Sequence, residues 1–157
     1  LQLSGTKYIQ LPFDTVFTIS GQYRTVGGSD DIPIFEREFL GGATNLRGYE
    51  YREGTGESLR DDQGEPLGGQ TAASFTAEYS FPIANFRKFR GHVFYDGGLL
   101  SENAWDLGGD YLSDVGIGID LYLPVGPIRL DLAWPLQKDE WVEDEVRLQF
   151  NMGYQFR

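Results

Sequence analysis

Cysteine is absent from the 157 residues, and the chain has a single histidine, His92. Without cysteine, neither a disulfide-rich secreted scaffold nor a thiolate metal site can form. A lone histidine is a weak basis for a Ser-His-Asp triad or a histidine-bound metal. The sequence also has no G-x-x-x-x-G-K phosphate loop. We therefore expect no enzymatic activity, no metal and no cofactor.

Long hydrophobic runs are missing as well. None approaches the roughly 18–20 apolar residues of a membrane-spanning helix, and the mean hydropathy is −0.36. A helical membrane protein is thereby excluded. A transmembrane β-barrel is not, because strands that alternate between lipid and lumen have a low mean hydropathy. Twenty-one glycines and 15% aromatic residues favour strands, turns and interface girdles over helices.

Positive charge is scarce, with 13 Lys and Arg against 24 Asp and Glu and a net charge of −11. The acids concentrate in two segments, residues 25–70 and 138–145. Their spacing lacks the pattern of a calcium loop, so we interpret them as solvated outer loops. This balance disfavours nucleic acid as a partner, since phosphate neutralisation needs clustered Lys and Arg.

Alternation of apolar and polar residues dominates the rest of the chain and predicts strands with one apolar and one polar face. In the least regular segment, Val93 and Tyr95 share one side, and His92, Phe94 and Asp96 share the other. Seven segments alternate in this way: residues 1–11, 17–24, 75–81, 89–100, 115–123, 128–134 and 146–156.

Short and long connections take turns along the chain, which is the asymmetry of outer-membrane barrels. The long connections are expected at residues 25–70, 101–112 and 136–144. The longer alternating runs, of about 9–12 residues, match the length of a tilted membrane strand better than the roughly 5–6 residues of a soluble sandwich strand. We therefore predict an all-β antiparallel transmembrane β-barrel, a meander of about 7–8 strands. Ile32–Phe35 is a possible eighth strand, although Pro33 argues against it.

Arg47, in the long loop, has glycines on both sides and a tyrosine nearby that can fix its position. Gly41 and Gly42 precede Arg47, and Gly48 and Tyr49 follow it. The glycines permit tight backbone turns and the tyrosine supplies packing. This frame indicates an arginine that is directed at a partner.

The segments Phe39-Leu40-Gly41-Gly42 and Leu46-Arg47-Gly48-Tyr49 resemble the sixth-loop motif of BamA/TamA/Sam-type outer-membrane assembly factors, the bacterial surface antigen family. The resemblance extends over the whole chain, in the same order and spacing. Four further pieces carry it: Glu78-Tyr79, residues 94–98, residues 124–131 and residues 150–156.

The resemblance implies that the loop arginine folds into the lumen and pairs with acids of the inner wall. Parity independently places Glu78 and Asp96 on the polar face. We call the predicted set the loop lock: Arg47, Gly48, Tyr49, Gly41, Gly42, Glu78 and Asp96. The alternative is a salt bridge that only stabilises the loop. Asp120, Arg129 and Asp131 are interpreted as ordinary lumen lining.

The chain has fewer strands than the barrels it resembles, so residues 1–157 are expected to be the C-terminal part of a barrel. The remaining strands would come from an N-terminal half or from a second copy of the chain, a homo-oligomer. The resemblance also implies a weak seam between the first and last strands of the barrel, where an incoming strand could pair, with residues 145–156 on one side of it. The predicted seam residues are Val146, Leu148, Phe150, Gly153 and Phe156.

Two functions are in view. The first is an outer-membrane protein assembly and insertion factor of Gram-negative bacteria, which contacts membrane lipid and client outer-membrane proteins and consumes no nucleotide. The second is a small structural barrel or passive pore without assembly activity.

Overall fold

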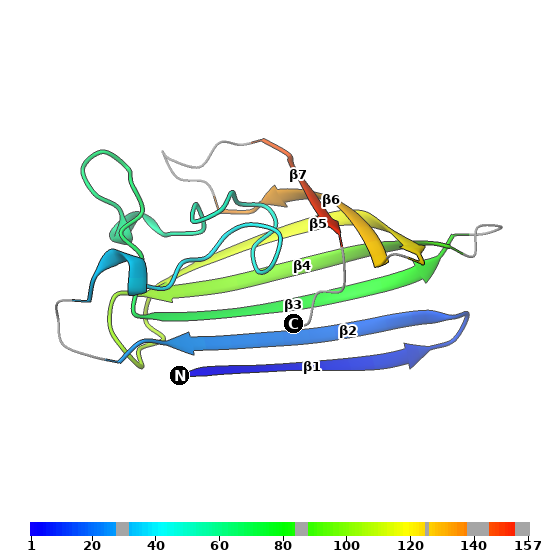
Figure 1. The fold of residues 1–157 in the computed structure, drawn as a ribbon, viewed down its shortest axis with the longest axis horizontal. Coiled ribbons are helices and arrows are strands. Elements are labelled where there is room, and N and C mark those ends of the chain that lie inside the picture. The colour runs from blue at the N-terminus through cyan, green and yellow to red at the C-terminus, as the bar shows by residue number, and fades with distance from the viewer. Residues whose placement is uncertain (28–31, 84–87, 125, 138–144, 153–157) are drawn as a thin grey trace.

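A single antiparallel sheet forms the protein, with its strands arranged in chain order. The computed structural model describes residues 1–27, 32–83, 88–124, 126–137 and 145–152. The strands are β1 (Gln2–Leu11), β2 (Thr15–Thr25), β3 (Thr71–Pro82), β4 (Phe89–Ser101), β5 (Asp110–Leu123), β6 (Gly126–Pro135) and β7 (Arg147–Met152), as Figure 1 shows.

Within the described residues, helical structure is limited to two 3₁₀ turns in the long loop, η1 (Ile34–Glu36) and η2 (Glu57–Leu59). Neither these nor any other helix in the described ranges is long and apolar enough to cross a membrane.

The register of the sheet sorts the side chains into apolar and polar rows. One apolar row crosses every strand and consists of Ile9, Phe17, Tyr79, Val93, Ile117, Leu132 and Leu148. The adjacent row, on the opposite face, consists of Tyr8, Thr18, Glu78, Phe94, Gly116, Ala133 and Arg147. A shift of one residue would exchange the two faces, so the apolar row fixes the register.

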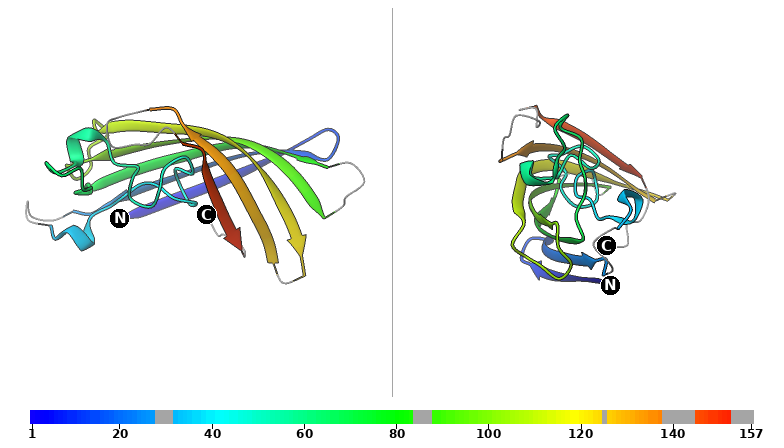
Figure 2. Two further views of the ribbon diagram at one scale, coloured as in Figure 1. Left: turned by 90° about the horizontal axis from the view of Figure 1, so that it is seen from above. Right: turned by 90° about the vertical axis from the view of Figure 1, so that its left-hand side faces the viewer.

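The sheet curls into an open arc around the long loop. The end-on view in Figure 2 shows the loop on the concave face, with β1 and β7 at the two ends of the arc. In the described ranges β1 pairs only with β2, and β7 only with β6. The convex face bears the exposed apolar side chains, whereas the concave face bears the polar and charged side chains together with apolar ones that are buried, such as Phe94 and Leu100.

The only core cluster of the described residues lies between the loop and the wall. It joins loop residues to side chains of β3, β4 and β5, and consists of Leu40, Leu46, Tyr49, Leu59, Ala72, Leu100 and Leu112. A sandwich would bury its apolar faces against a second sheet. Here the apolar face stays exposed and the loop supplies the buried packing, as a lipid-facing sheet requires.

Several expected boundaries differ from the observed ones. β3 begins at Thr71 and β5 at Asp110, each four or five residues earlier than the alternation predicted. The connection between β4 and β5, residues 102–109, is therefore shorter than the predicted 101–112. The possible eighth strand is wrong, because Ile34–Glu36 forms a 3₁₀ turn after Pro33. Of the last predicted segment the structure describes β7, and Gly153 and Phe156 lie outside the described residues.

Candidate functional site

The loop segment around Arg47 is shaped by its glycines and one asparagine. Gly41 and Gly42 adopt positive φ angles of 108° and 94°. The side-chain Oδ1 of Asn45 accepts hydrogen bonds from the backbone N–H of Gly41 at 2.9 Å and of Leu46 at 2.8 Å. The N–H of Gly42 donates to the carbonyl of Leu46 at 3.1 Å. These bonds close a tight turn that presents Arg47 to the wall.

Arg47 is fully buried, and its guanidinium meets carboxylates from three strands. Nε and Nη2 donate to the two oxygens of Asp96, at 2.7 and 2.9 Å. Nη1 donates to Glu78 at 3.2 Å and to Asp131 at 3.1 Å. We call Glu78, Asp96 and Asp131 the carboxylate cluster. A two-point pairing of this kind matches the fixed fork of donors of arginine.

The ring of Phe94 supports the guanidinium from one side, with its centroid 3.2 Å from Cζ of Arg47. Burial alone would lower the pKa of Arg47, but the hydrogen bond to Asp96 and the charges of the carboxylate cluster raise it above its ordinary value. The group therefore stays charged, and its charge is met by cluster oxygens rather than by water.

The structure thus brings Arg47, Glu78 and Asp96 together on the concave face. It also places Asp131 in direct contact with Arg47, and the interpretation of Asp131 as ordinary lining was wrong. Asp131 shares the face of Glu78, so parity placed it on the right side of the sheet. Alternation predicts the face of the sheet on which a residue lies, but it does not predict whether that residue is close enough to contact Arg47.

Three further residues extend the network beyond the loop. Arg129 forms an ion pair with Glu78, and its Nε lies 3.0 Å from Oδ2 of Asp131. His92 bridges two acids, with Nε2 2.6 Å from Asp131 and Nδ1 3.1 Å from Asp120. His92 is not predicted as a site residue from sequence, because a single histidine carries no spacing signal.

Gly48 and Tyr49 bring the loop close to β5. A Cβ on Gly48 would overlap the side chain of Asp114, so only glycine fits at this approach. Tyr49 is fully buried and its hydroxyl donates to the carbonyl of Ser113 at 3.2 Å and of Gln137 at 3.3 Å. Of the predicted loop-lock residues on the loop, Arg47, Gly48 and Tyr49 therefore lie at the contact with the sheet, whereas Gly41 and Gly42 pack against other parts of the loop.

β7, which carries the predicted seam residues, also contacts the loop. Leu148 and Phe150 are exposed on the convex face, and Val146 precedes the strand. The intervening side chains face the loop. Arg147 pairs with Glu50 at 3.0 Å and Glu53 at 3.2 Å.

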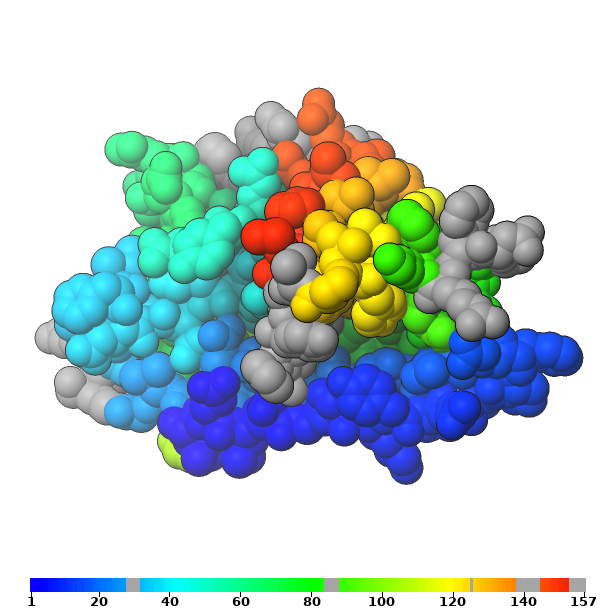
Figure 3. Space-filling view, turned by 45° about the vertical axis from the view of Figure 1, so that its right-hand side comes forward, coloured from blue at the N-terminus to red at the C-terminus, as the bar shows by residue number. Residues whose placement is uncertain are grey.

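Two amides continue this contact along β7. Gln149 donates to the carbonyl of Arg47 at 3.1 Å, and Asn151 donates to the carbonyl of Ala43 at 3.4 Å. In the space-filling view of Figure 3, the loop lies between β1 and β2 on one side and β7 on the other.

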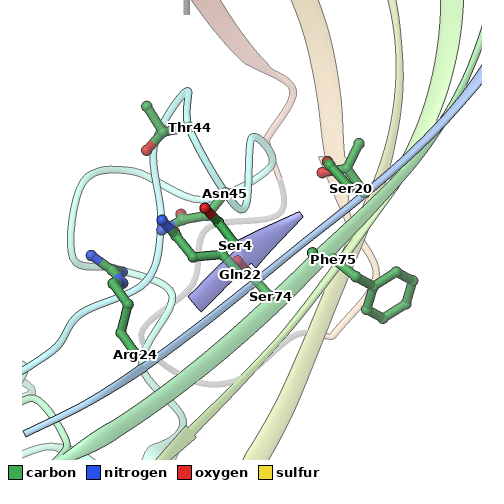
Figure 4. Close-up of a pocket in the computed structure, with 10 residues that line it drawn as sticks. Ser4, Ser20, Gln22, Arg24, Thr44, Asn45, Ser74 and Phe75 are labelled. Carbon is green, nitrogen blue, oxygen red and sulfur yellow. The ribbon is translucent and has the colours of Figure 1, made fainter. Parts of the chain in front are cut away.

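A polar cavity of about 350 Å³ lies where the loop meets β1, β2 and β3. Ser4, Gln22, Ser74 and Asn45 line it in Figure 4, whereas the ring of Phe75 points away from it. In the part of the chain that the structure describes, no group of three or more His, Cys, Asp or Glu could hold a metal ion.

Comparison with known proteins identifies the family. Residues 1–156 match the Omp85 superfamily domain. The chain belongs to the Omp85 superfamily. Two outer membrane protein assembly factors BamA are each 29% identical to it, from Neisseria meningitidis and Nitratidesulfovibrio vulgaris. These matches cover 92% and 82% of this chain but only 22% and 16% of the relatives.

A solved structure has the same fold. BamA from Haemophilus ducreyi, lacking POTRA domains 1–3, superposes with a TM-score of 0.71 at 21% identity, over 95% of this chain and 33% of the other. The comparisons confirm the predicted family, the antiparallel β-barrel fold class and the outer membrane of a Gram-negative bacterium as the location.

Proposed function

We propose that this chain is a barrel portion, the C-terminal one, of an outer-membrane protein assembly and insertion factor. The observation that carries the proposal is the buried contact of Arg47 with the carboxylate cluster, in a chain of the Omp85 superfamily. The names of the BamA relatives support the same function. The proposed activity is strand insertion into the membrane without nucleotide, metal or enzyme chemistry.

The side chain of Arg47 joins three strands through the carboxylate cluster. Asp96 lies on β4, Glu78 on β3 and Asp131 on β6, and all three reach the same guanidinium. Removing one partner of a buried pair leaves an uncompensated charge and costs about 3–5 kcal/mol. The loop is therefore held as a unit, and its release would be a discrete event rather than a gradual loosening.

The loop is in turn connected to the proposed seam. β7 has six paired residues with β6, and each of its three concave-facing side chains bonds to the loop. In our proposal, release of the loop frees the edge of β7, and an incoming client strand pairs with the exposed N–H and C=O groups. Client outer-membrane proteins and membrane lipid are the partners of this step.

Closure of the barrel requires strands beyond the seven of this sheet. The resemblance in fold to a chain three times as long supports their supply by the same polypeptide. A second copy of the chain is the other source. The mass of the purified particle in detergent distinguishes a monomer from a homo-oligomer.

The decisive variant is Arg47→Ala, with Arg52→Ala as its matched control. Arg52 lies in the same loop and is exposed, and it stacks on the rings of Phe39 and Tyr51. We expect Arg47→Ala to impair insertion of client barrels into membranes, and Arg52→Ala to leave it intact. Normal client insertion by Arg47→Ala, together with an ion conductance like that of the parent, would instead favour the structural barrel or passive pore.

A further inference from the structure

His92 lies on β4 and on the concave face, where its ring is fully buried between two carboxylates. Nε2 lies 2.6 Å from Oδ1 of Asp131, and Nδ1 lies 3.1 Å from Oδ2 of Asp120. The ring also packs beside Phe94, with centroids 6.0 Å apart. His92 does not contact Arg47 directly, but it shares Asp131 with it.

The contact between His92 and Asp131 is possible because Gly118, which lies between them on β5, has no side chain. His92 on β4 is opposite Gly118 on β5, and Gly118 is opposite Asp131 on β6. Strands two positions apart are separated by about 9–10 Å, which a histidine and an aspartate together span. A Cβ on Gly118 would overlap both Nε2 of His92 and Oδ1 of Asp131.

The number of hydrogen-bond donors and acceptors around His92 indicates the protonation state of its ring. An ionised carboxylate only accepts, and a neutral imidazole has one donor and one acceptor nitrogen. Both nitrogens of His92 face carboxylate oxygens, so both bonds form only when both nitrogens carry a proton. Among the described residues, Glu78 on β3 and Arg129 on β6 are the other charged groups that act on the ring, and Arg47 is connected to it through Asp131.

Asp131 divides its two oxygens between its neighbours. Oδ1 takes the bond from His92, whereas Oδ2 takes the bonds from Arg47 at 3.1 Å and from Arg129 at 3.0 Å. Nε of Arg129 also lies 3.2 Å from Oδ1. Without the histidine, the carboxylate is free to turn fully toward Arg129 and away from the loop.

We propose that His92 is a positioning residue of the loop lock: a doubly protonated imidazolium that bridges Asp120 and Asp131 and holds Asp131 against Arg47. The inference deepens the proposed function and rests on it for the meaning of the lock. It can be tested separately from that function, since it concerns the protonation state of the His92 ring and the packing of the loop against the sheet.

The first test needs no variant. ¹⁵N-histidine NMR of the protein in lipid nanodiscs at about pH 7 reports the protonation of the ring directly, and His92→Gln assigns the signal by its loss. We expect the paired nitrogen shifts of an imidazolium. The shifts of a neutral tautomer, with the proton on one of the carboxylates instead, would overturn the proposal.

The second test measures the seating of the loop by hydrogen exchange, without any client protein. We expect His92→Gln to raise amide exchange in residues 41–49 by at least about tenfold, because the loop opens locally more often. Gly118→Ala should do the same by displacing the ring. Tyr122→Phe, on the same face but outside the network, is the control and should leave the exchange unchanged.

Unchanged exchange in His92→Gln and Gly118→Ala would show that His92 does not position the loop. Failure of the proposed function has a different signature. In that case the His92→Gln loop still loosens, while Arg47→Ala inserts client barrels normally.

Discussion

Arg47 and Asp96 form a two-point ion pair, Nε to Oδ2 at 2.7 Å and Nη2 to Oδ1 at 2.9 Å, in which both side chains are inaccessible to solvent. The backbone N–H of Arg47 also lies 3.5 Å from Asp96, and the hydroxyl of Thr76 donates to it at 2.7 Å. Asp96 is therefore the carboxylate on which the loop contact is centred. The other acids share their oxygens with Arg129 or His92.

The first prediction concerns this pair. Asp96→Asn removes the charge that faces two guanidinium nitrogens and presents an amide N–H₂ to one of them. We expect a loss of about 3–5 kcal/mol in the free energy of unfolding. Denaturant titration of the folded barrel in detergent measures it.

Glu78→Gln provides the comparison for the first prediction. The Glu78 side chain is 13% exposed, and without its charge Arg47 keeps Asp96 and Asp131. We expect a smaller loss of about 1–3 kcal/mol. An equal or larger loss for Glu78→Gln would contradict the assignment of Asp96 as the central partner.

More of the fold than of the candidate site could be predicted from the sequence. Period-two alternation depends on local residue order, so it identified all the strands and their faces. It missed the starts of β3 and β5, where residues such as Ala72 and Leu112 are buried by the loop rather than facing lipid or water. The apolar and polar sides are not distinguishable there from sequence order alone.

Some partners of Arg47 could be predicted from the sequence and others could not. Glu78 and Asp96 were predicted from parity and from the resemblance. Asp131 and His92 lie on the predicted face, but their contact depends on the register of three strands and on the space above Gly118. Neither quantity is encoded within one segment, so the sequence could not separate these residues from ordinary lining.

A second prediction uses the close approach of the loop to β5. Gly48→Ala would place a methyl group against the side chain of Asp114 and the backbone of Pro135. We expect overpacking to cost about 1–3 kcal/mol and to raise proteolysis within the loop. Gly5→Ala is the control, because nothing lies within 4 Å of a Cβ there. Equal protease resistance of the two variants would argue against a tightly seated loop.

A third prediction concerns the hydroxyl of Tyr49. Tyr49→Phe keeps the ring in the core cluster but removes the donor to the carbonyls of Ser113 and Gln137. Because the Ser113 carbonyl keeps the backbone hydrogen bond from Leu136 and Gln137 is only partly buried, we expect a loss of about 0.5–1.5 kcal/mol, that of an ordinary hydrogen bond. The measurement is the denaturant midpoint of the folded barrel. A loss as large as that of Tyr49→Ala would mean that the variant had disrupted packing, not only the hydrogen bonds.

The last prediction tests whether the loop lock and the proposed seam are coupled. The Arg47 side chain does not bond to β7, but its carbonyl accepts from Gln149, and the loop also pairs with Arg147 and Asn151. If the loop leaves the wall, β7 loses these contacts and keeps six paired residues with β6. We therefore expect Arg47→Ala to raise amide exchange in residues 147–152 by about tenfold or more. β2 is paired along its length on both sides and should be unaffected. Equal increases in β2 and β7 would indicate general destabilisation, and an unchanged β7 would separate the loop from the seam.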